Sequence, residues 1–263
     1  MRGRFAAVLV VTVLVAAGAL VLAFTVAPSA DQRQQTDDAG RIGRAYEREL
    51  TQSIDDLAAY VVKRRFENET DYQKLHEQVT VQMDEVPRIP KEGTTAYGRQ
   101  HSRDYRTAAS RRELELEPFR ALVTRLENDV IPRQEFVEVG IDLVQINPAK
   151  LLEGFVVQFS GSALRTEVVP AYKKARKKLR AQKPDPADAE LARDLERYAD
   201  DAIKMTKDGA DDIDAGRGFF FEFGDKPDTL LTRLENTQRS IAVEVSTLVD
   251  AFDTPTGSQI EPQ

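Results

Sequence analysis

The sequence contains no cysteine and no tryptophan, and it has only two histidines, His76 and His101, among 263 residues. The lack of cysteine excludes a disulfide scaffold, a thiolate zinc site, an iron–sulfur cluster and a cysteine nucleophile. Two histidines are also too few for an all-nitrogen metal site or for the usual histidine-based triad. We therefore predict no metal, no cofactor and no catalytic residue.

Acidic residues are missing from the first 30 positions, which carry Arg2 and Arg4. Between Phe5 and Ala27 the chain has 23 uncharged, mostly apolar residues. As a helix this segment is about 34 Å long, enough to cross a bilayer core of about 30 Å. Because positive charge is retained in the cytoplasm, we predict that residues 1–30 are a membrane anchor with a cytoplasmic N-terminus.

Two other leaders could explain the same apolar segment. A cleaved signal peptide stays open, although the best cleavage site is followed by Pro28 and the apolar run is longer than usual. A pilin-type leader fits less well, because Val8 and Leu9 stand where such helices carry a glutamate. The uncleaved anchor is the prediction that we carry forward, with the lipid bilayer contacted through residues 5–27.

Most of the remaining chain, which has a net charge of −9 from residue 31 onward, shows apolar residues at helical spacing. Examples are Ile42, Tyr46, Leu50, Ile54, Leu57 and Val61. No second run of 18 apolar residues follows the first. The predicted fold is all-α: an N-terminal transmembrane helix, then an antiparallel bundle of about five or six helices over residues 31–252, with a mobile tail at 253–263.

Prolines divide this pattern. Pro132 and Pro170 predict kinks or breaks, and Asn147 before Pro148 predicts a helix start. Pro184-Asp185-Pro186 forces a turn between a basic segment and an acidic one. We predict that these two segments form an antiparallel helical hairpin. The run Phe219–Phe223, bounded by glycines, is predicted to fill the core rather than to form a strand.

The C-terminal helix, expected from Pro227 to Phe252, carries a coiled-coil-like seam. The seam residues are Leu231, Leu234, Gln238, Ile241, Val245, Leu248 and Phe252. The helix containing Ile42 is one predicted partner and a second subunit is the other. Internal burial costs no association entropy, so a monomer is favoured over a homodimer.

Residues 87–110 are predicted to be one long irregular loop, since Pro87, Pro90, Gly93 and Gly98 interrupt any period. This stretch is basic within an acidic chain. We predict that it is mobile and contacts an anionic partner. The candidate contacts are Arg88, Lys91, Arg99, Arg103 and Arg106.

A second basic segment lies between residues 173 and 183. Charge complementarity with the following acidic helix is the favoured explanation, and contact with anionic lipid or polymer is the alternative. Its basic residues surround the helix instead of following one groove-matching face, so no nucleic-acid partner is predicted. The candidate contacts are Lys173, Lys174, Arg176, Lys177 and Lys178.

Several short motifs were tested against their required spacing. His76-Glu77 lacks the second histidine of a zinc-protease helix, because position 80 is threonine. Ser160 and Ser162 do not stand in a Gly-x-Ser-x-Gly pattern. The acids between Asp208 and Asp214 do not match a calcium loop. Asn68 begins a glycosylation sequon whose use depends on the host.

No motif therefore defines a reaction. The favoured function is a membrane-anchored extracytoplasmic helical module that acts as an interaction, adaptor or sensor-like protein without catalytic activity, with an unidentified protein partner. The alternatives are a hydrolase that uses carboxylates on a surface polymer, and a structural or filament subunit. Two convergent carboxylates in a pocket would favour the hydrolase, whereas an exposed apolar or charged face would favour binding.

Overall fold

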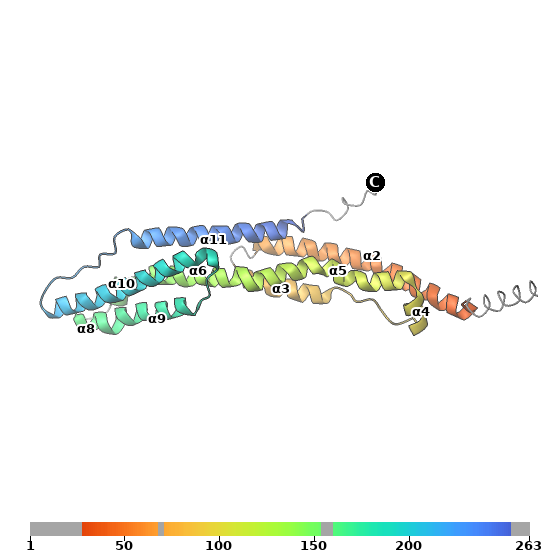
Figure 1. The fold of residues 1–263 in the computed structure, drawn as a ribbon, viewed down its shortest axis with the longest axis horizontal. Coiled ribbons are helices and arrows are strands. Elements are labelled where there is room, and N and C mark those ends of the chain that lie inside the picture. The colour runs from red at the N-terminus through yellow and green to blue at the C-terminus, as the bar shows by residue number, and fades with distance from the viewer. Residues whose placement is uncertain (1–27, 68–70, 154–159, 254–263) are drawn as a thin grey trace, which may run out of the picture. The chain divides into compact units, whose positions relative to one another are not determined.

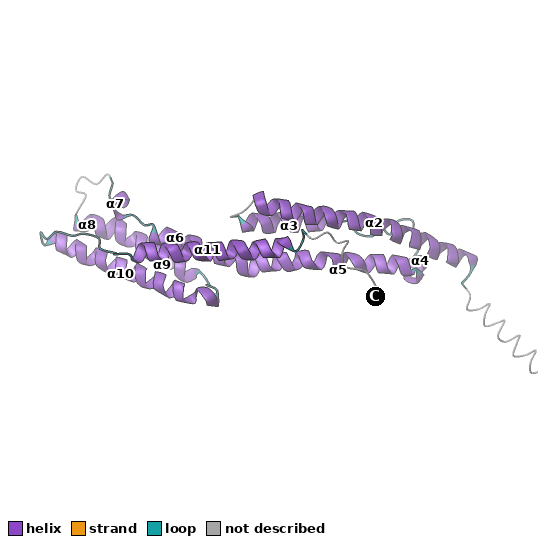
Figure 2. Cartoon of the chain, turned by 90° about the horizontal axis from the view of Figure 1, so that it is seen from above, coloured by secondary structure: helices purple, strands orange, loops and turns teal. Residues whose placement is uncertain are grey.

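The computed structural model describes residues 28–67, 71–153 and 160–253. Within these ranges the chain is all-helical and contains no strand (Figures 1 and 2). The predicted span 5–27, the sequon at Asn68 and most of the predicted tail lie outside them. The elements are α2 (Ala30–Glu67), α3 (Tyr72–Glu85), α4 (Ala96–His101), α5 (Arg103–Arg125), η1 (Leu126–Val130), α6 (Ile131–Val144), α7 (Pro148–Leu151), α8 (Gly161–Ala163), η2 (Leu164–Val168), α9 (Val169–Ala181), η3 (Pro186–Asp188), α10 (Ala189–Asp214) and α11 (Lys226–Asp250).

The described chain forms two compact units. Unit 1 comprises residues 28–56 and 84–117, and unit 2 comprises residues 57–83 and 118–253 without the gaps named above. The division falls within α2, α3 and α5. Each unit has its own buried apolar residues, so each is described by itself.

In unit 1, α2 begins at a reciprocal cap. The Ser29 hydroxyl accepts a hydrogen bond from the Gln32 amide at 3.2 Å, and the Ser29 amide donates to Gln32 Oε1 at 2.8 Å. This arrangement satisfies donors that the first helical turn leaves free. Further along, Gly43 lets α5 approach closely, because an added Cβ would lie 2.9 Å from the backbone of Tyr105.

The prediction of a long irregular loop at 87–110 was wrong, because helix covers much of this stretch. Only residues 86–95 and Ser102 lie outside helices there. Thr95 starts α4 by accepting a hydrogen bond from the Gly98 amide at 3.0 Å. In α5 the buried stripe continues upstream through Tyr105, Ala108 and Arg112. Because Ala108 is small and Arg112 is charged, a pattern of large apolar residues does not reveal this stripe.

In unit 2, α9 and α10 form the predicted antiparallel hairpin, which is confirmed. Asp185 opens the connecting turn by accepting a hydrogen bond from the Ala187 amide at 2.8 Å. Arg176 then pairs with Asp200, and Arg180 pairs with Glu196 at 3.2 Å. The later residue on α9 meets the earlier one on α10, so the helices run in opposite directions, side by side in both views (Figures 1 and 2).

Pro132 and Pro170 do not break their helices. Each follows a five-residue π-helical segment, η1 before Pro132 and η2 before Pro170. Proline lacks an amide proton, and its ring collides with the carbonyl four residues earlier in an α-helix. The wider π turn changes the local hydrogen-bond register, so the chain remains helical through both prolines.

The C-terminal helix α11 buries one continuous face in unit 2. Leu234 packs against α6, where a Cβ on Gly140 would lie 2.6 Å from its Cδ2. The predicted seam is partly correct, since Leu234, Ile241 and Val245 are buried. Gln238 is exposed, and α6 is a covering helix that the sequence analysis did not name.

The segment Phe219–Phe223 is an extended loop whose odd-numbered rings turn toward helices. A Cβ on Gly209 of α10 would lie 2.3 Å from the Phe219 ring, which explains the glycine. The Phe223 ring lies 5.5 Å from Tyr198 and 6.4 Å from Tyr172 between centroids. Phe220 is 82% exposed, so the run covers the core only in part.

Candidate partner-binding groove and basic surfaces

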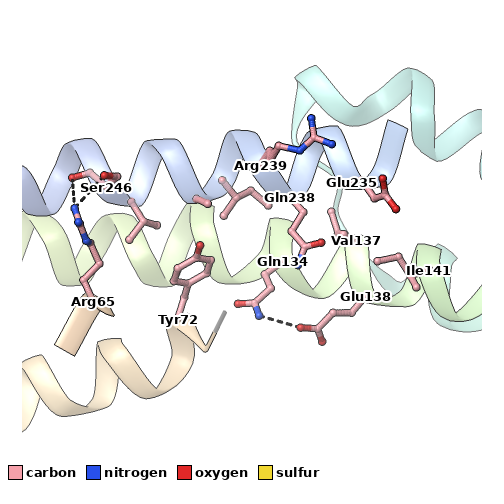
Figure 3. A pocket seen from close by; sticks show the side chains of 13 residues that line it. Arg65, Tyr72, Gln134, Val137, Glu138, Ile141, Glu235, Gln238, Arg239 and Ser246 are labelled. Atoms are coloured by element: carbon pink, nitrogen blue, oxygen red, sulfur yellow. Dashed lines mark hydrogen bonds between the residues drawn. The ribbon is translucent and has the colours of Figure 1, made fainter. Parts of the chain in front are cut away.

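A groove of about 500 Å³ crosses the surface of unit 2 (Figure 3). Its floor consists of Val137 on α6 with Ile241 and Val245 on α11, all at most 2% exposed. These residues belong to the packed interface between α6 and α11, so the floor is apolar and fixed. The floor itself is buried, so the apolar surface that a ligand can reach is that of exposed Ala242 and half-buried Ile141.

Polar side chains border this floor. Gln134 and Glu138 come from α6, and Glu235, Gln238 and Arg239 come from α11. Gln134 donates a hydrogen bond to Glu138 at 2.9 Å across one turn of α6. An apolar floor with a polar border resembles the core and rim of a protein-binding surface.

One end of the groove is held by Arg65, in the part of α2 that belongs to unit 2. Its Nη1 lies 3.0 Å from Ser246 Oγ and 2.5 Å from Asp250 Oδ1, both on α11. Buried Tyr72 lies at the side contributed by α3. Four helices, α2, α3, α6 and α11, thus meet at the groove.

An ion network lies behind the groove. Arg133 of α6 contacts Asp188 at 3.0 Å and Glu244 of α11 at 3.2 Å, and Arg125 contacts Glu244 at 2.8 Å. The Arg133 and Asp188 side chains are only 14% and 7% exposed. Because a buried charge is costly without its partner, this network fixes η3 and α11 against α6.

The two acids of the groove do not form a pair. The Glu138 carboxylate accepts its hydrogen bond from Gln134, while Glu235 lies on α11 and is directed elsewhere (Figure 3). A carboxylate-based glycosidase needs two acids facing one bond. Within the described part of the chain, no group of three or more metal-ligating side chains is present.

In unit 1, the predicted basic contacts are not equivalent. Arg88, Lys91, Arg103 and Arg106 are exposed. Arg99 is half-buried and donates to the Thr94 carbonyl at 3.1 Å and to the Thr94 hydroxyl at 3.0 Å. The four exposed residues are available to a partner, whereas Arg99 also holds the start of α4.

Arg112, two residues beyond the predicted loop, has a structural role. Its guanidinium donates to the Val86 carbonyl through Nε at 3.2 Å and Nη2 at 3.1 Å. Only 8% of this residue is exposed. Arg112 therefore ties α5 to the end of the α3 segment inside unit 1.

On α9 the arginines and lysines separate by role. Arg176 and Arg180 pair with acids of α10, as the charge-complementarity hypothesis requires. Lys178 is 4.0 Å from Asp142, whereas Lys173, Lys174 and Lys177 are exposed and have no ion-pair partner among the described residues. The predicted basic contacts thus form two separate sets. One set lies on α9 in unit 2, and the other lies in unit 1.

The remaining motifs have structural explanations. Ser160 caps α8 by accepting a hydrogen bond from the Ala163 amide at 3.1 Å. Asp211 and Asp214, from the segment tested for calcium, lie 2.5 Å and 2.6 Å from the Arg165 guanidinium. Arginine thus compensates these carboxylates within unit 2.

Sequence reasoning missed the groove itself. Its residues come from helices that are far apart in the chain, and only packing shows which faces meet. One signal was present: the C-terminal seam is interrupted by Gln238, and a polar residue within an apolar stripe can mark an edge open to solvent. The small Ala242 beside Ile241 was a second signal.

Comparisons with known proteins give no match: no protein family, characterised protein or solved structure is significantly similar to this chain. None of the helices within the described ranges is both long and apolar enough to cross a membrane. The apolar segment Phe5–Ala27 is not within those ranges.

Proposed function

We propose that this chain is a membrane-anchored helical module that binds a protein partner outside the cytoplasm and acts as an adaptor or sensor-like component without catalysis. In this proposal residues 5–27 span the membrane once, and the helices that follow form a largely antiparallel, monomeric bundle. The charge distribution around the apolar segment supports this orientation.

The observation that carries the binding role is the groove between α6 and α11. The groove offers apolar surface at exposed Ala242 and half-buried Ile141 beside its buried floor, and its border supplies amides and charges of both signs. Such a groove suits the apolar face of a helix, with polar contacts at the edges. We therefore expect an amphipathic helical segment of the partner to bind there.

The groove favours binding over hydrolysis. The Glu138 and Glu235 side chains do not converge (Figure 3). A hydrolase of the carboxylate type would need an acid and a base or nucleophile on either side of one substrate bond. No particular observation favours a filament subunit.

Site-specific crosslinking on intact membranes tests the groove. A photoreactive residue replaces Ala242, and a matched one replaces Ser240, which is exposed on the same helix but does not line the groove. We expect a defined crosslinked product from position 242 and none from position 240. In a second arm, the photoreactive residue replaces Gln238, which also lines the groove. A242R should then abolish crosslinking from position 238, whereas S240R should leave it intact. Equal crosslinking from positions 242 and 240 would refute the groove as the binding site.

A further inference from the structure

The short helix α4 is packed against the first turns of α2 in unit 1. Thr95, which caps α4, donates through its hydroxyl to Gln35 Oε1 at 2.8 Å. A Cβ on Gly98 would lie 2.3 Å from the Gln35 carbonyl, so α4 and α2 approach as closely as glycine allows. Both views place α4 beside the N-terminal part of α2 (Figures 1 and 2). Sequence separation conceals this contact, since Gln35 and Gly98 are far apart in the chain.

This contact lies close to the predicted membrane span. The span ends at Ala27, α2 begins at Ala30, and Gln35 is in its second turn. Three extended residues and five helical ones cover at most about 20 Å, whatever the tilt of α2. The headgroup layer adds roughly 5–8 Å on each side of the hydrocarbon core. If residues 5–27 are in a bilayer, α4 is therefore held near the lipid headgroups.

The residues around this contact are basic, although the chain as a whole is acidic. Residues 28–44 and 87–106 together contain eight lysines and arginines against five acids. Two of the acids are already compensated, Asp38 by Arg41 and Asp104 by Arg44. Within the described residues, Arg88, Lys91, Arg103 and Arg106 have no ion-pair partner. This region keeps an excess of exposed positive charge.

Helix stability does not explain this arrangement. Arg103 is the first residue of α5 and Arg106 is in its first turn. Cations oppose the helix dipole at that end, so they are unfavourable there unless an external anion compensates them. Tyr97 and His101 on α4 stack with ring centroids 3.9 Å apart, and Tyr97 is half-exposed. Tyrosine is enriched where a protein meets the membrane–water interface.

We infer that Lys91, α4 and the first turn of α5 form a juxtamembrane surface that binds the anionic phospholipid headgroups of the membrane in which the chain is anchored. This inference rests on the proposed membrane anchor and adds a second lipid contact to it. The contributing side chains are Lys91, Tyr97, Arg103 and Arg106. A single anchor leaves the helices free to tilt, whereas a second, electrostatic contact holds unit 1 at the surface.

The absence of tryptophan from the chain allows a direct test with one introduced fluorophore. The full-length Y97W variant is reconstituted into phosphatidylcholine vesicles, with or without one quarter phosphatidylglycerol, and brominated lipids serve as quenchers. We expect several-fold stronger quenching of the introduced indole in the anionic vesicles. Q100W provides a second probe on α4 if Y97W disturbs the stacking on His101, and circular dichroism checks that helix content is retained.

L114W is the matched control, because Leu114 is 73% exposed on α5 but lies three turns beyond Arg103. It should show little quenching in either vesicle. In the Y97W background, R103E/R106E should remove the phosphatidylglycerol-dependent part of the quenching. K204E/K207E changes the net charge by the same amount at two exposed positions of α10 and should leave this quenching unchanged.

The outcomes separate the inference from the proposed anchor. Flotation with pure phosphatidylcholine vesicles and resistance to carbonate measure anchoring alone. If the chain is anchored but Y97W and Q100W are not quenched, or if K204E/K207E has the same effect as R103E/R106E, the lipid-binding surface is refuted and the anchor stands. If the chain is anchored and the indole is quenched equally with and without phosphatidylglycerol, the anionic-lipid surface is also refuted. An acidic protein would then be the ligand of these basic residues. Failure to float refutes both.

Discussion

At the scale of single residues, burial changes the ionisation of two tyrosines that lie close together in unit 2. Tyr172 is fully buried, and its hydroxyl is 3.5 Å from the Ile146 carbonyl. Burial raises the pKa of the Tyr172 phenol far above its ordinary value of about 10, and burial also raises the pKa of Tyr198. The rings are 6.5 Å apart, edge to face.

These shifts predict a loss of stability at alkaline pH. Below about pH 10 both phenols are protonated in the folded and unfolded chains, so they cause no pH dependence. Above it the unfolded chain releases protons that the folded chain keeps, so the free energy of unfolding falls, and Tyr172 contributes up to about 1.4 kcal/mol per pH unit. Tyr198 contributes in the same direction. Urea titrations between pH 8 and 11 should show this slope.

Y172F should reduce that slope, because it removes the phenol and keeps the ring. Y172F/Y198F removes both phenols and should reduce the slope further than Y172F alone. An unaltered alkaline slope in Y172F would show that other groups cause the loss of stability.

Individual residues also show the limit of sequence reasoning. Large apolar residues at regular spacing were assigned correctly to the buried face, as for Leu50, Leu57 and Val61. Arg112 is the opposite case, a charged residue that is only 8% exposed. Residue type predicts that an arginine is exposed. Arg112 is buried because its guanidinium donates to the Val86 carbonyl, which is 26 positions away in the sequence.

At the scale of helices, local signals were sufficient where the physics is local. The Asn147 cap, the Asp185 turn and the α9–α10 charge complementarity all depend on neighbouring residues, and the structure contains each of them. The two prolines were read as kinks or breaks because proline cannot join a regular α-helix. The π segments before them avoid the break, and a sequence pattern based on 3.6 residues per turn does not represent that solution.

The α11 helix provides a stability prediction. Leu234 is fully buried and packs against Gly140 and Leu195. L234A should lower the free energy of unfolding by about 2–5 kcal/mol, because it leaves a cavity in the α6–α11 interface. Q238L should be nearly neutral, since Gln238 is exposed. Chemical denaturation measures both, and a loss below about 1 kcal/mol for L234A would mean that this interface is not fixed as described.

At the scale of the whole chain, the all-α class followed from periodicity alone, because almost every segment has one apolar stripe. The groove did not follow, since it depends on which stripes face one another. The same limit applies to the surface around α4, where Gly98 and Gln35 meet although 63 positions separate them. Both candidate surfaces arise from contacts between distant segments, which one sequence does not encode as a local pattern.

Topology is the remaining prediction for the whole chain, and the absence of cysteine makes it measurable. Single cysteines are placed at Gln100 in unit 1, at Ser240 in unit 2 and at Gly3 before the predicted span. A membrane-impermeant maleimide applied to intact cells should label Q100C and S240C, because Arg2 and Arg4 keep the N-terminus inside. G3C should react only after permeabilisation, whereas labelling of G3C alone would reverse the orientation. If Q100C and S240C react but carbonate releases a chain that lacks its N-terminal residues, the segment is a cleaved signal peptide, and both the anchor and the lipid surface beside it would be wrong.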